Sequence, residues 1–232
     1  ATILDFTFHR KHWKKHLHTW IRKDKPDVIG MSSNTMYMKY IKKIAHEIKD
    51  HYDLPIILGG YHASQYPEDT LKIKEIDAVC IGDGEYSLTE YLNRLENKKS
   101  PKNIDGIWIK NNEKIIKNKP GSFIEEIDDL PYPHWELWKD LDKYFYFLGM
   151  LYVIGTRGCI YNCTNCDARG IKDAVEGKYY RVRDPVDYAK ELNYHYEKFN
   201  NKNLRLFQMF DQIPTMDYGW LSKFCNAYMK YN

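Results

Sequence analysis

Three cysteines are the residues of this sequence whose type and spacing most directly indicate chemistry. Cys159, Cys163 and Cys166 stand in the segment Gly-Thr-Arg-Gly-Cys-Ile-Tyr-Asn-Cys-Thr-Asn-Cys at residues 155–166. This close spacing can bring three thiolates to one point. A cubane 4Fe-4S cluster has four irons, so three cysteine ligands leave one iron open to bind a small molecule through nitrogen and oxygen.

Zinc and disulfides are the competing uses of these cysteines. A structural zinc site needs a fourth ligand, and the remaining cysteines, Cys80 and Cys225, lie far off in the chain without paired spacing. The odd total of five cysteines and the lack of a signal peptide disfavour a disulfide framework. A zinc-stabilised binding module without enzymatic activity stays open as an alternative.

A short apolar run must position the cysteines. Residues 151–154 predict a buried strand, and Gly155 and Gly158 turn it into a loop. The thiols are therefore expected at the carboxyl end of a strand, where α/β architectures place their chemistry. The segment resembles the cluster loop of radical S-adenosylmethionine (radical SAM) enzymes. In that family the open iron chelates the amino and carboxylate groups of SAM, whose sulfonium is cleaved reductively.

The first 95 residues alternate between strand-like and helical patterns. Strands are predicted at 1–5, 27–33, 54–58 and 76–81, and helices at 12–23, from about 35 to 48, and from 85 through 92. Such alternation predicts an α/β fold with a Rossmann-like, doubly wound parallel sheet. Its strand-end loops, 31–34, 59–64 and 82–85, should line the edge where ligands of this architecture bind.

Three phrases in this region, ahead of the cysteines, carry a second resemblance. They are Gly-Gly-Tyr-His-Ala-Ser at 59–64, Tyr-Pro-Glu at 66–68 and Gly-Asp-Gly-Glu at 82–85. They resemble the cobalamin-binding domain that precedes many radical SAM domains, and the resemblance runs from about residue 20 to the end of the chain. It implies cobalamin contacts at Ser32, Ser33, Gly59, Gly60, His62, Gly84 and Glu85.

Two features depart from that class. The strand and helix with which it usually begins are not found, and no Asp-x-His-x-x-Gly sequence supplies a histidine to cobalt. For His62, an ordinary hydrogen-bonding role in its loop is the alternative to a contact with the corrin.

The second half continues with a connector and the start of another domain. Residues 106–116 predict a small hairpin, and the prolines of 127–133 predict an extended linker. A helix is predicted from about 186 to 199, with Asp184 as its cap and Pro185 at its first position, followed by a strand at 204–211. Residues 151–232 have room for about two strand–helix units, the beginning of a partial (β/α)6 radical SAM barrel. We therefore predict a piece of a longer polypeptide with domains at 1–95, 96–150 and 151–232.

The radical SAM resemblance also implies residues that bind SAM. They are Tyr161, Asn165, Arg183, Asp211 and Gln212. Relatives carry Gly-Gly-Glu or an Asp-Asp pair at the second strand end, so Asp211 matches and Gln212 departs from the pattern. Asn165 stands where an aromatic residue is common. For Arg183 and its neighbour Arg181, an ordinary salt-bridge role is the alternative.

Composition limits the partners. With 35 basic and 32 acidic residues the net charge is only +3, so no nucleic-acid partner is indicated. No apolar run approaches the roughly 18 residues of a membrane span, so no membrane partner is expected either. Cytoplasm is the expected compartment, because an accessible iron cluster needs reducing conditions.

The two resemblances together imply an enzyme with a 4Fe-4S cluster, SAM and cobalamin as cofactors. It would cleave SAM to a 5'-deoxyadenosyl radical and methylate an unactivated carbon of a small-molecule or peptide substrate. An electron donor such as flavodoxin or ferredoxin would be its partner. Cyclisation, rearrangement or sulfur insertion without catalytic cobalamin is the alternative outcome.

Overall fold

The computed structural model describes residues 1–112 and 114–231, and these form two compact units. The five-stranded unit contains residues 12–124 and 162–177, and the crossover unit contains residues 1–11, 125–161 and 178–232. Each unit is therefore built from separate stretches of the chain. The consecutive domains proposed from the sequence, 1–95, 96–150 and 151–232, stay a prediction.

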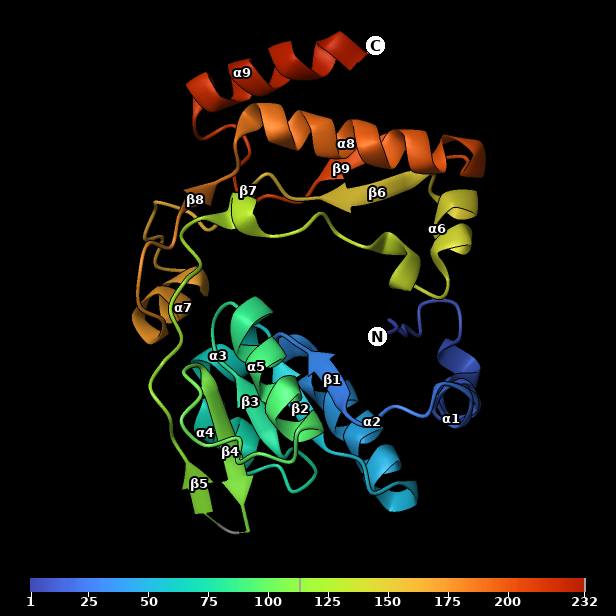
Figure 1. Ribbon diagram of the computed structural model, residues 1–232, viewed down its shortest axis with the longest axis vertical. Coiled ribbons are helices and arrows are strands. Elements are labelled where there is room, and N and C mark those ends of the chain that lie inside the picture. Colours follow the sequence, from blue (N-terminus) through green and yellow to red (C-terminus); the bar gives the residue numbers. More distant parts are fainter. Residues whose placement is uncertain (113, 232) are drawn as a thin grey trace. The chain divides into compact units, whose positions relative to one another are not determined.

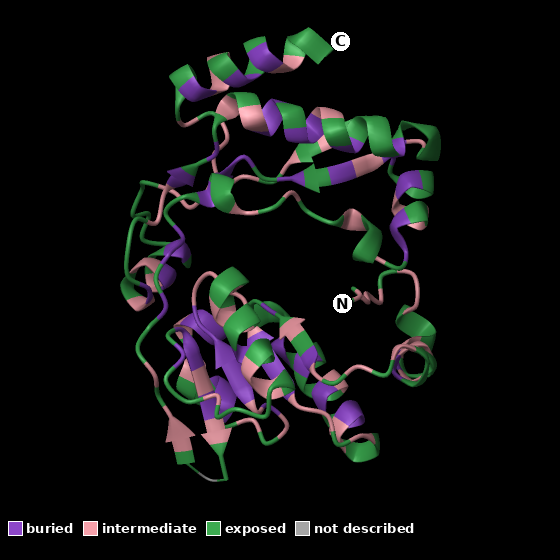
Figure 2. Cartoon of the chain, in the orientation of Figure 1, coloured by how far each residue is buried: buried purple, intermediate pink, exposed green. Residues whose placement is uncertain are grey.

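The five-stranded unit is organised around one mixed sheet with the order β1-β2-β3-β4-β5 (Figure 1). Its parallel strands are β1 (Ile29–Ser32), β2 (Ile56–Gly59) and β3 (Ala78–Cys80). The hairpin of β4 (Ile107–Asn111) and β5 (Lys114–Ile116) continues the sheet in antiparallel fashion. Figure 2 shows the central strands as buried, which explains their almost wholly apolar sequences. The α/β fold with parallel strands is confirmed.

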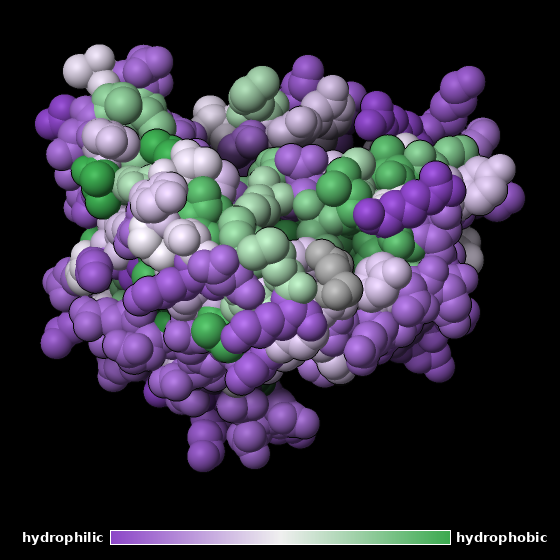
Figure 3. Space-filling view, turned by 90° about the horizontal axis from the view of Figure 1, so that it is seen from above, coloured by the Kyte–Doolittle hydropathy of each residue, from purple (hydrophilic) through white to green (hydrophobic). Residues whose placement is uncertain are grey.

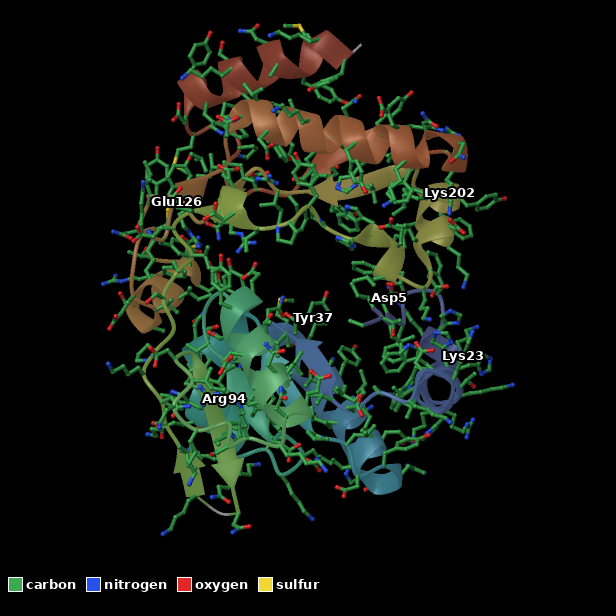
Figure 4. All side chains as sticks on the ribbon, in the orientation of Figure 1. Asp5, Lys23, Tyr37, Arg94, Glu126 and Lys202 are labelled. Carbon is green, nitrogen blue, oxygen red and sulfur yellow. The ribbon has the colours of Figure 1, made fainter. Side chains whose placement is uncertain are left out.

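The helices predicted at 12–23, about 35–48 and 85–92 are found in this unit as α1 (Trp13–Asp24), α2 (Met38–His51) and α5 (Glu85–Glu96), and further short helices accompany them. The short helices are η2 (Thr35–Tyr37), α3 (Tyr61–Gln65), α4 (Pro67–Leu71) and α7 (Ala168–Ala174). The Asn34 side chain caps η2 by accepting from the Met36 N–H at 3.1 Å. Tyr37, labelled in Figure 4, is the last residue of η2 and is 57% exposed, whereas Met38, the first residue of α2, is buried.

The crossover unit contains a parallel pair of strands joined by a helix. Strands β6 (Met150–Val153) and β9 (Leu206–Met209) pair in register, and α8 (Pro185–Phe199) connects them. Figure 1 shows α8 lying along this sheet and α9 (Tyr218–Tyr228) packed on α8. Asp184 caps α8 by accepting from two N–H groups, at 2.9 and 2.8 Å, with Pro185 in the first turn. The predicted cap, helix and second strand are thus confirmed.

Shorter elements complete the crossover unit. They are η3 (Ile127–Asp129), η4 (Trp135–Leu137), α6 (Leu141–Phe147), β7 (Thr156–Arg157), β8 (Arg181–Val182), η5 (Asn200–Lys202) and η6 (Met229–Tyr231), with η1 (Arg10–His12) near the beginning of the chain. The strand predicted at 1–5 is wrong. Only Ile3 forms an isolated bridge, to Trp138, because its amide pairs with the Leu137 carbonyl at 2.7 Å.

The surface carries mainly polar side chains. Figure 3 shows hydrophilic residues over most of the visible face, interrupted by smaller apolar groups. Within residues 1–112 and 114–231, no helix has the length and apolar character needed to cross a bilayer.

Candidate functional site

The three clustered cysteines lie on a loop whose base is fixed by two short strands. Strands β7 and β8 pair antiparallel, with Thr156 opposite Val182 and Arg157 opposite Arg181, and residues 158–180 form the excursion between them. All three cysteines are free; Cys163 and Cys166 are exposed and Cys159 is partly exposed. Thiols in this state are available to a metal cluster.

One backbone group within the loop already donates a hydrogen bond to a cysteine sulfur. The Tyr161 N–H donates to Cys159 Sγ at 3.4 Å, and the Cys166 N–H donates to the Cys163 carbonyl at 3.2 Å. Hydrogen bonds to sulfur are among the features that tune iron–sulfur clusters. This donor set fits a 4Fe-4S cluster held by three thiolates. The Tyr161 ring is 55% exposed and Asn165 is exposed on the same loop.

A fourth thiolate from Cys80 is disfavoured by its environment. Cys80 is buried at the end of β3, and burial, with the charges of Glu85 and Asp83, raises the pKa of its thiol to about 11. A protonated thiol is a poor metal ligand at neutral pH. Cys225, the other remaining cysteine, is exposed on α9.

Two glycines determine the shape of the loop base. Gly155 is buried, and a Cβ there would lie 2.7 Å from atoms of both the Tyr188 and Trp220 rings. Gly158 has φ +82°, and a Cβ there would overlap the carbonyl oxygen of Tyr179. Only glycine satisfies both the conformation and the space immediately before Cys159.

Asp211 follows β9 and joins it to the start of the cysteine loop. Its Oδ1 accepts from the Gly155 N–H at 3.0 Å, from the Thr156 hydroxyl at 2.7 Å and from the Thr156 N–H. Its Oδ2 is buried and has no hydrogen-bond partner among the residues that the structure describes. Burial raises the pKa of this carboxyl, although the hydrogen bonds from Thr156 act in the opposite direction. A buried acceptor with one free oxygen fits the ammonium group of SAM.

Two other residues implied for SAM, Gln212 and Arg183, have protein partners. Gln212 Nε2 donates to the Tyr179 hydroxyl at 3.0 Å. Arg183 is only 8% exposed, and its guanidinium donates to three carboxylates and faces the Tyr132 ring. The carboxylates belong to Asp128 at 3.1 Å, Asp187 at 2.9 Å and Glu191. This geometry favours the salt-bridge role for Arg183, because its donors are already engaged. Arg181 is also buried, and its Nε donates to the Tyr179 carbonyl at 3.2 Å.

The structure brings the loops after β1 and β2 together at one edge of the five-stranded unit. The Ser33 N–H donates to the Gly59 carbonyl at 3.2 Å, and the His62 N–H donates to the Ser33 carbonyl at 3.0 Å. Gly60 has φ +85°, and a Cβ there would lie 2.7 Å from Ser32 Oγ and 2.8 Å from the Ser33 carbonyl oxygen. The double glycine therefore allows these two loops to touch.

The loop after β3 meets the same edge. The Ser64 hydroxyl, which was not predicted as a site residue, accepts from the Gly82 N–H at 3.0 Å. Gly84 precedes α5, and Glu85, its first residue, is exposed. His62 Nδ1 lies 3.0 Å from Thr35 Oγ1, and burial, with the charge of Lys42, lowers the pKa of this histidine. These contacts support the hydrogen-bonding role for His62.

Three comparisons place this arrangement among known proteins. Residues 1–92 match the B12 binding domain family. The anaerobic magnesium-protoporphyrin IX monomethyl ester cyclase of Synechocystis is 29% identical over 88% of this chain and 40% of that protein. An uncharacterized methyltransferase of Pyrococcus horikoshii is 32% identical over 76% of this chain and 38% of that protein.

A solved structure extends the similarity to the fold. The radical SAM methyltransferase TsrM of Kitasatospora setae, with tryptophan and a SAM analogue bound, superposes with a TM-score of 0.76 at 18% identity, over 97% of this chain and 44% of that one. The same protein with cobalamin and a [4Fe-4S] cluster gives a TM-score of 0.73.

These findings define the class of the fold. Over nearly its whole length the chain has the fold of cobalamin-dependent radical SAM enzymes, with a B12-binding-type unit and the start of a radical SAM barrel. The resemblance seen in the sequence is confirmed. The chain spans about two fifths of the length of the curated relatives.

Proposed function

We propose that this chain belongs to a cobalamin-dependent radical SAM methyltransferase and supplies its cofactor-binding half. The observation that carries the proposal is the loop of three free thiols at the carboxyl end of β6. Cys159, Cys163 and Cys166 would hold a 4Fe-4S cluster and leave one iron to SAM. When bound, the reduced cluster would supply the electron that cleaves SAM, and cobalamin would supply the methyl group.

Asp211 is the residue that we propose for the SAM amino group. Its Oδ1 accepts hydrogen bonds from Gly155 and Thr156, while its buried Oδ2 has no partner within residues 1–112 and 114–231. An ammonium donor would satisfy that oxygen and offset the cost of burying the charge. Gln212 would add a neutral acceptor beside it, and the exposed ring of Tyr161 would pack near the adenine, with Asn165 on the same loop.

The edge formed by the loops after β1, β2 and β3 is the proposed cobalamin site. Ser32, Ser33, Gly59 and Gly60 would approach the nucleotide tail through the closely packed loop pair. Gly84 and Glu85 would approach from the start of α5. His62 is bonded to Thr35 Oγ1 at 3.0 Å, so we assign it a role in shaping the loop.

The open face of the β6–β9 sheet suggests where a substrate would lie. Tyr152 and Phe210 are 43% and 68% exposed on this face, with their ring centroids 5.4 Å apart. A parallel pair is normally covered on both faces. We propose that this aromatic face lines the barrel interior and contacts a small-molecule or peptide substrate.

For the whole enzyme we propose flavodoxin or ferredoxin as the electron donor and the cytoplasm as the compartment.

The decisive experiment measures metal and corrinoid in full-length protein prepared without oxygen. We expect about four irons and one corrinoid per chain. Replacing Cys159, Cys163 and Cys166 together by alanine should abolish the iron and SAM cleavage. Cys225→Ala, which removes an exposed thiol outside the loop, should change neither. Zinc near one equivalent with little iron would refute the proposal in favour of a zinc-stabilised binding module.

Cyclisation without methyl transfer is the second candidate, favoured by the similarity to the Synechocystis cyclase. The products of SAM separate the two. A methyltransferase of this kind should release both S-adenosylhomocysteine and 5'-deoxyadenosine under reducing conditions. Formation of 5'-deoxyadenosine alone would favour cyclisation, rearrangement or sulfur insertion.

A further inference from the structure

Two short helices connect the cysteine loop with the double-glycine loop inside the five-stranded unit. Helix α3 begins at Tyr61, directly after Gly60, and helix α7 begins at Ala168, shortly after Cys166. The two helices pack against each other. Ala168, Ile171 and Val175 are buried, and this helical spacing shows that α7 presents one continuous apolar face to its unit.

A polar contact fixes the amino-terminal end of α7. Gln65, the last residue of α3, donates from Nε2 to the carbonyl of Asp167 at 3.2 Å. Asp167 is the residue after Cys166, so this bond restrains the backbone next to the third thiol.

Gly170 provides the space for this bond. A Cβ at Gly170 would lie 2.5 Å from Gln65 Oε1 and 2.9 Å from its Cδ. Because Gln65 is a flexible side chain, an alanine at 170 would displace the amide rather than unfold the helix. The absence of a side chain at Gly170 is therefore required by the position of the Gln65 amide and not only by the packing of the helix.

The far end of α7 is anchored to the loop after β3. A Cβ at Gly82 would lie 3.0 Å from Val175 Cγ1, so these residues are closely packed. The Phe123 N–H donates to the Glu176 carbonyl at 2.8 Å, and the Glu176 N–H donates to the Gly121 carbonyl at 3.3 Å. Helix α7 is thus held at its amino-terminal end by α3 and at its carboxyl-terminal end by the loop after β3 and residues 121–123.

We propose that Gln65 and Gly170 form a clamp that couples the double-glycine loop to the third cysteine. Gln65 is a positioning residue: corrinoid bound beside Gly59 and Gly60 restrains α3, and the Gln65–Asp167 bond passes that restraint to the backbone at Cys166. The proposal rests on the proposed function for its cofactors, but the clamp itself is a contact of this chain alone.

The test uses the full-length protein with four variants: Gln65→Ala, Gly170→Ala, the double variant, and Gly30→Ala as control. Gly30 is an exposed strand glycine with nothing within 4 Å of an added Cβ. Hydrogen exchange over residues 162–177 and the rate of iron loss to a chelator are measured with and without hydroxocobalamin. Losing one hydrogen bond should raise exchange near 167–170 about five-fold in each single variant.

The double variant distinguishes best between one shared contact and two independent effects. If the clamp exists, it should behave like Gln65→Ala alone, because the bond is already lost and alanine at 170 then fits. Hydroxocobalamin should slow exchange over 162–177 in the wild type and in Gly30→Ala, but much less in Gln65→Ala. Iron should leave Gln65→Ala several-fold faster than the wild type.

Two results would overturn the clamp. One is amide exchange at the wild-type rate in both single variants, and the other is a double variant whose exchange rate rises by the product of the two single effects. Equal protection by hydroxocobalamin in the wild type and Gln65→Ala would also overturn it. A wild type that binds neither iron nor corrinoid would instead refute the proposed function, and the exchange data from the cofactor-free variants would still decide whether the clamp exists.

Discussion

Asp211 shows, at the scale of single residues, how one carboxylate can serve both the fold and a ligand. Its Oδ1 ties the end of β9 to the turn after β6 through Gly155 and Thr156. Its Oδ2 is buried, and no atom in the described part of the chain forms a hydrogen bond with it. The sequence identified Asp211 by its place at a strand end, but not its bond to Thr156, because the two residues are 55 positions apart.

Replacing Asp211 with asparagine should separate these roles. Because burial raises the pKa of this carboxyl, ionising it in the folded protein costs stability at pH values above that raised pKa. This cost decreases as the pH falls, and it is absent below 3.8, the ordinary value, where the carboxyl is protonated in both the folded and the unfolded state. The stability of Asp211→Asn relative to the wild type should therefore rise as the pH rises from 3.8 to 7, because only the wild type must bury a charge. SAM affinity should fall about ten-fold, because a charge-assisted bond is lost.

Urea unfolding at several pH values and equilibrium dialysis with SAM measure the two effects. Asp142→Asn is the control, because Asp142 is an exposed residue of α6 whose ion pair with Lys202 is expected to contribute little. A relative stability of Asp211→Asn that does not change with pH would contradict the cost of the buried charge. Normal SAM binding by the variant would show that Asp211 acts only as a structural acceptor.

At the scale of elements, local patterns were sufficient for the strands and helices that carry the site. The apolar run of β6 and the Asp184–Pro185 start of α8 were predictable because each signal lies within a few residues. The segment 1–5 was mispredicted, since its apolar residues fit a strand but Ile3 pairs only with Leu137 and Trp138. Helix α7 could not be assigned to the five-stranded unit, because its partner Gln65 is 102 residues from Asp167.

The base of the cysteine loop should tolerate no side chain at position 158. Gly158→Ala must place a Cβ against the Tyr179 carbonyl with φ near +82°. A strained residue of this kind costs about 1–3 kcal/mol, and here the neighbour is backbone that cannot rotate away. We expect weaker β7–β8 pairing, seen as faster amide exchange at 156–157 and 181–182, and loss of most bound iron. Gly30→Ala should exchange and load iron like the wild type; equal behaviour of the two variants would contradict this reading of the loop base.

At the scale of the whole chain, the two units are assembled from segments distant in sequence. Residues 1–11 belong to the crossover unit together with 125–161 and 178–232. Asp5, labelled in Figure 4, makes this connection: it accepts from Trp138 Nε1 and from the Tyr144 hydroxyl, the latter at 3.1 Å. Contacts over more than 130 residues leave no local signal, so patterns in the sequence could not link Asp5 with Trp138 and Tyr144.

Asp5→Asn should therefore destabilise the crossover unit, although it changes the opposite end of the sequence. Burial by itself would raise the pKa of Asp5, but hydrogen bonds from Trp138, Thr7 and Tyr144 outweigh it and lower the pKa below 3.8. The ionised form is thus favoured in the folded state, and its contribution is present above pH 3.8 and lost as pH falls through the lowered pKa. We expect a cost of about 1 kcal/mol at pH 7 that disappears in acid.

Hydrogen exchange resolved by segment should show faster opening at 135–153 and unchanged opening at 56–80. Asp27→Asn, at an exposed position of the five-stranded unit, should alter neither segment, and an Asp5→Asn effect confined to residues 12–124 would show that the amino-terminal segment is built into the other unit.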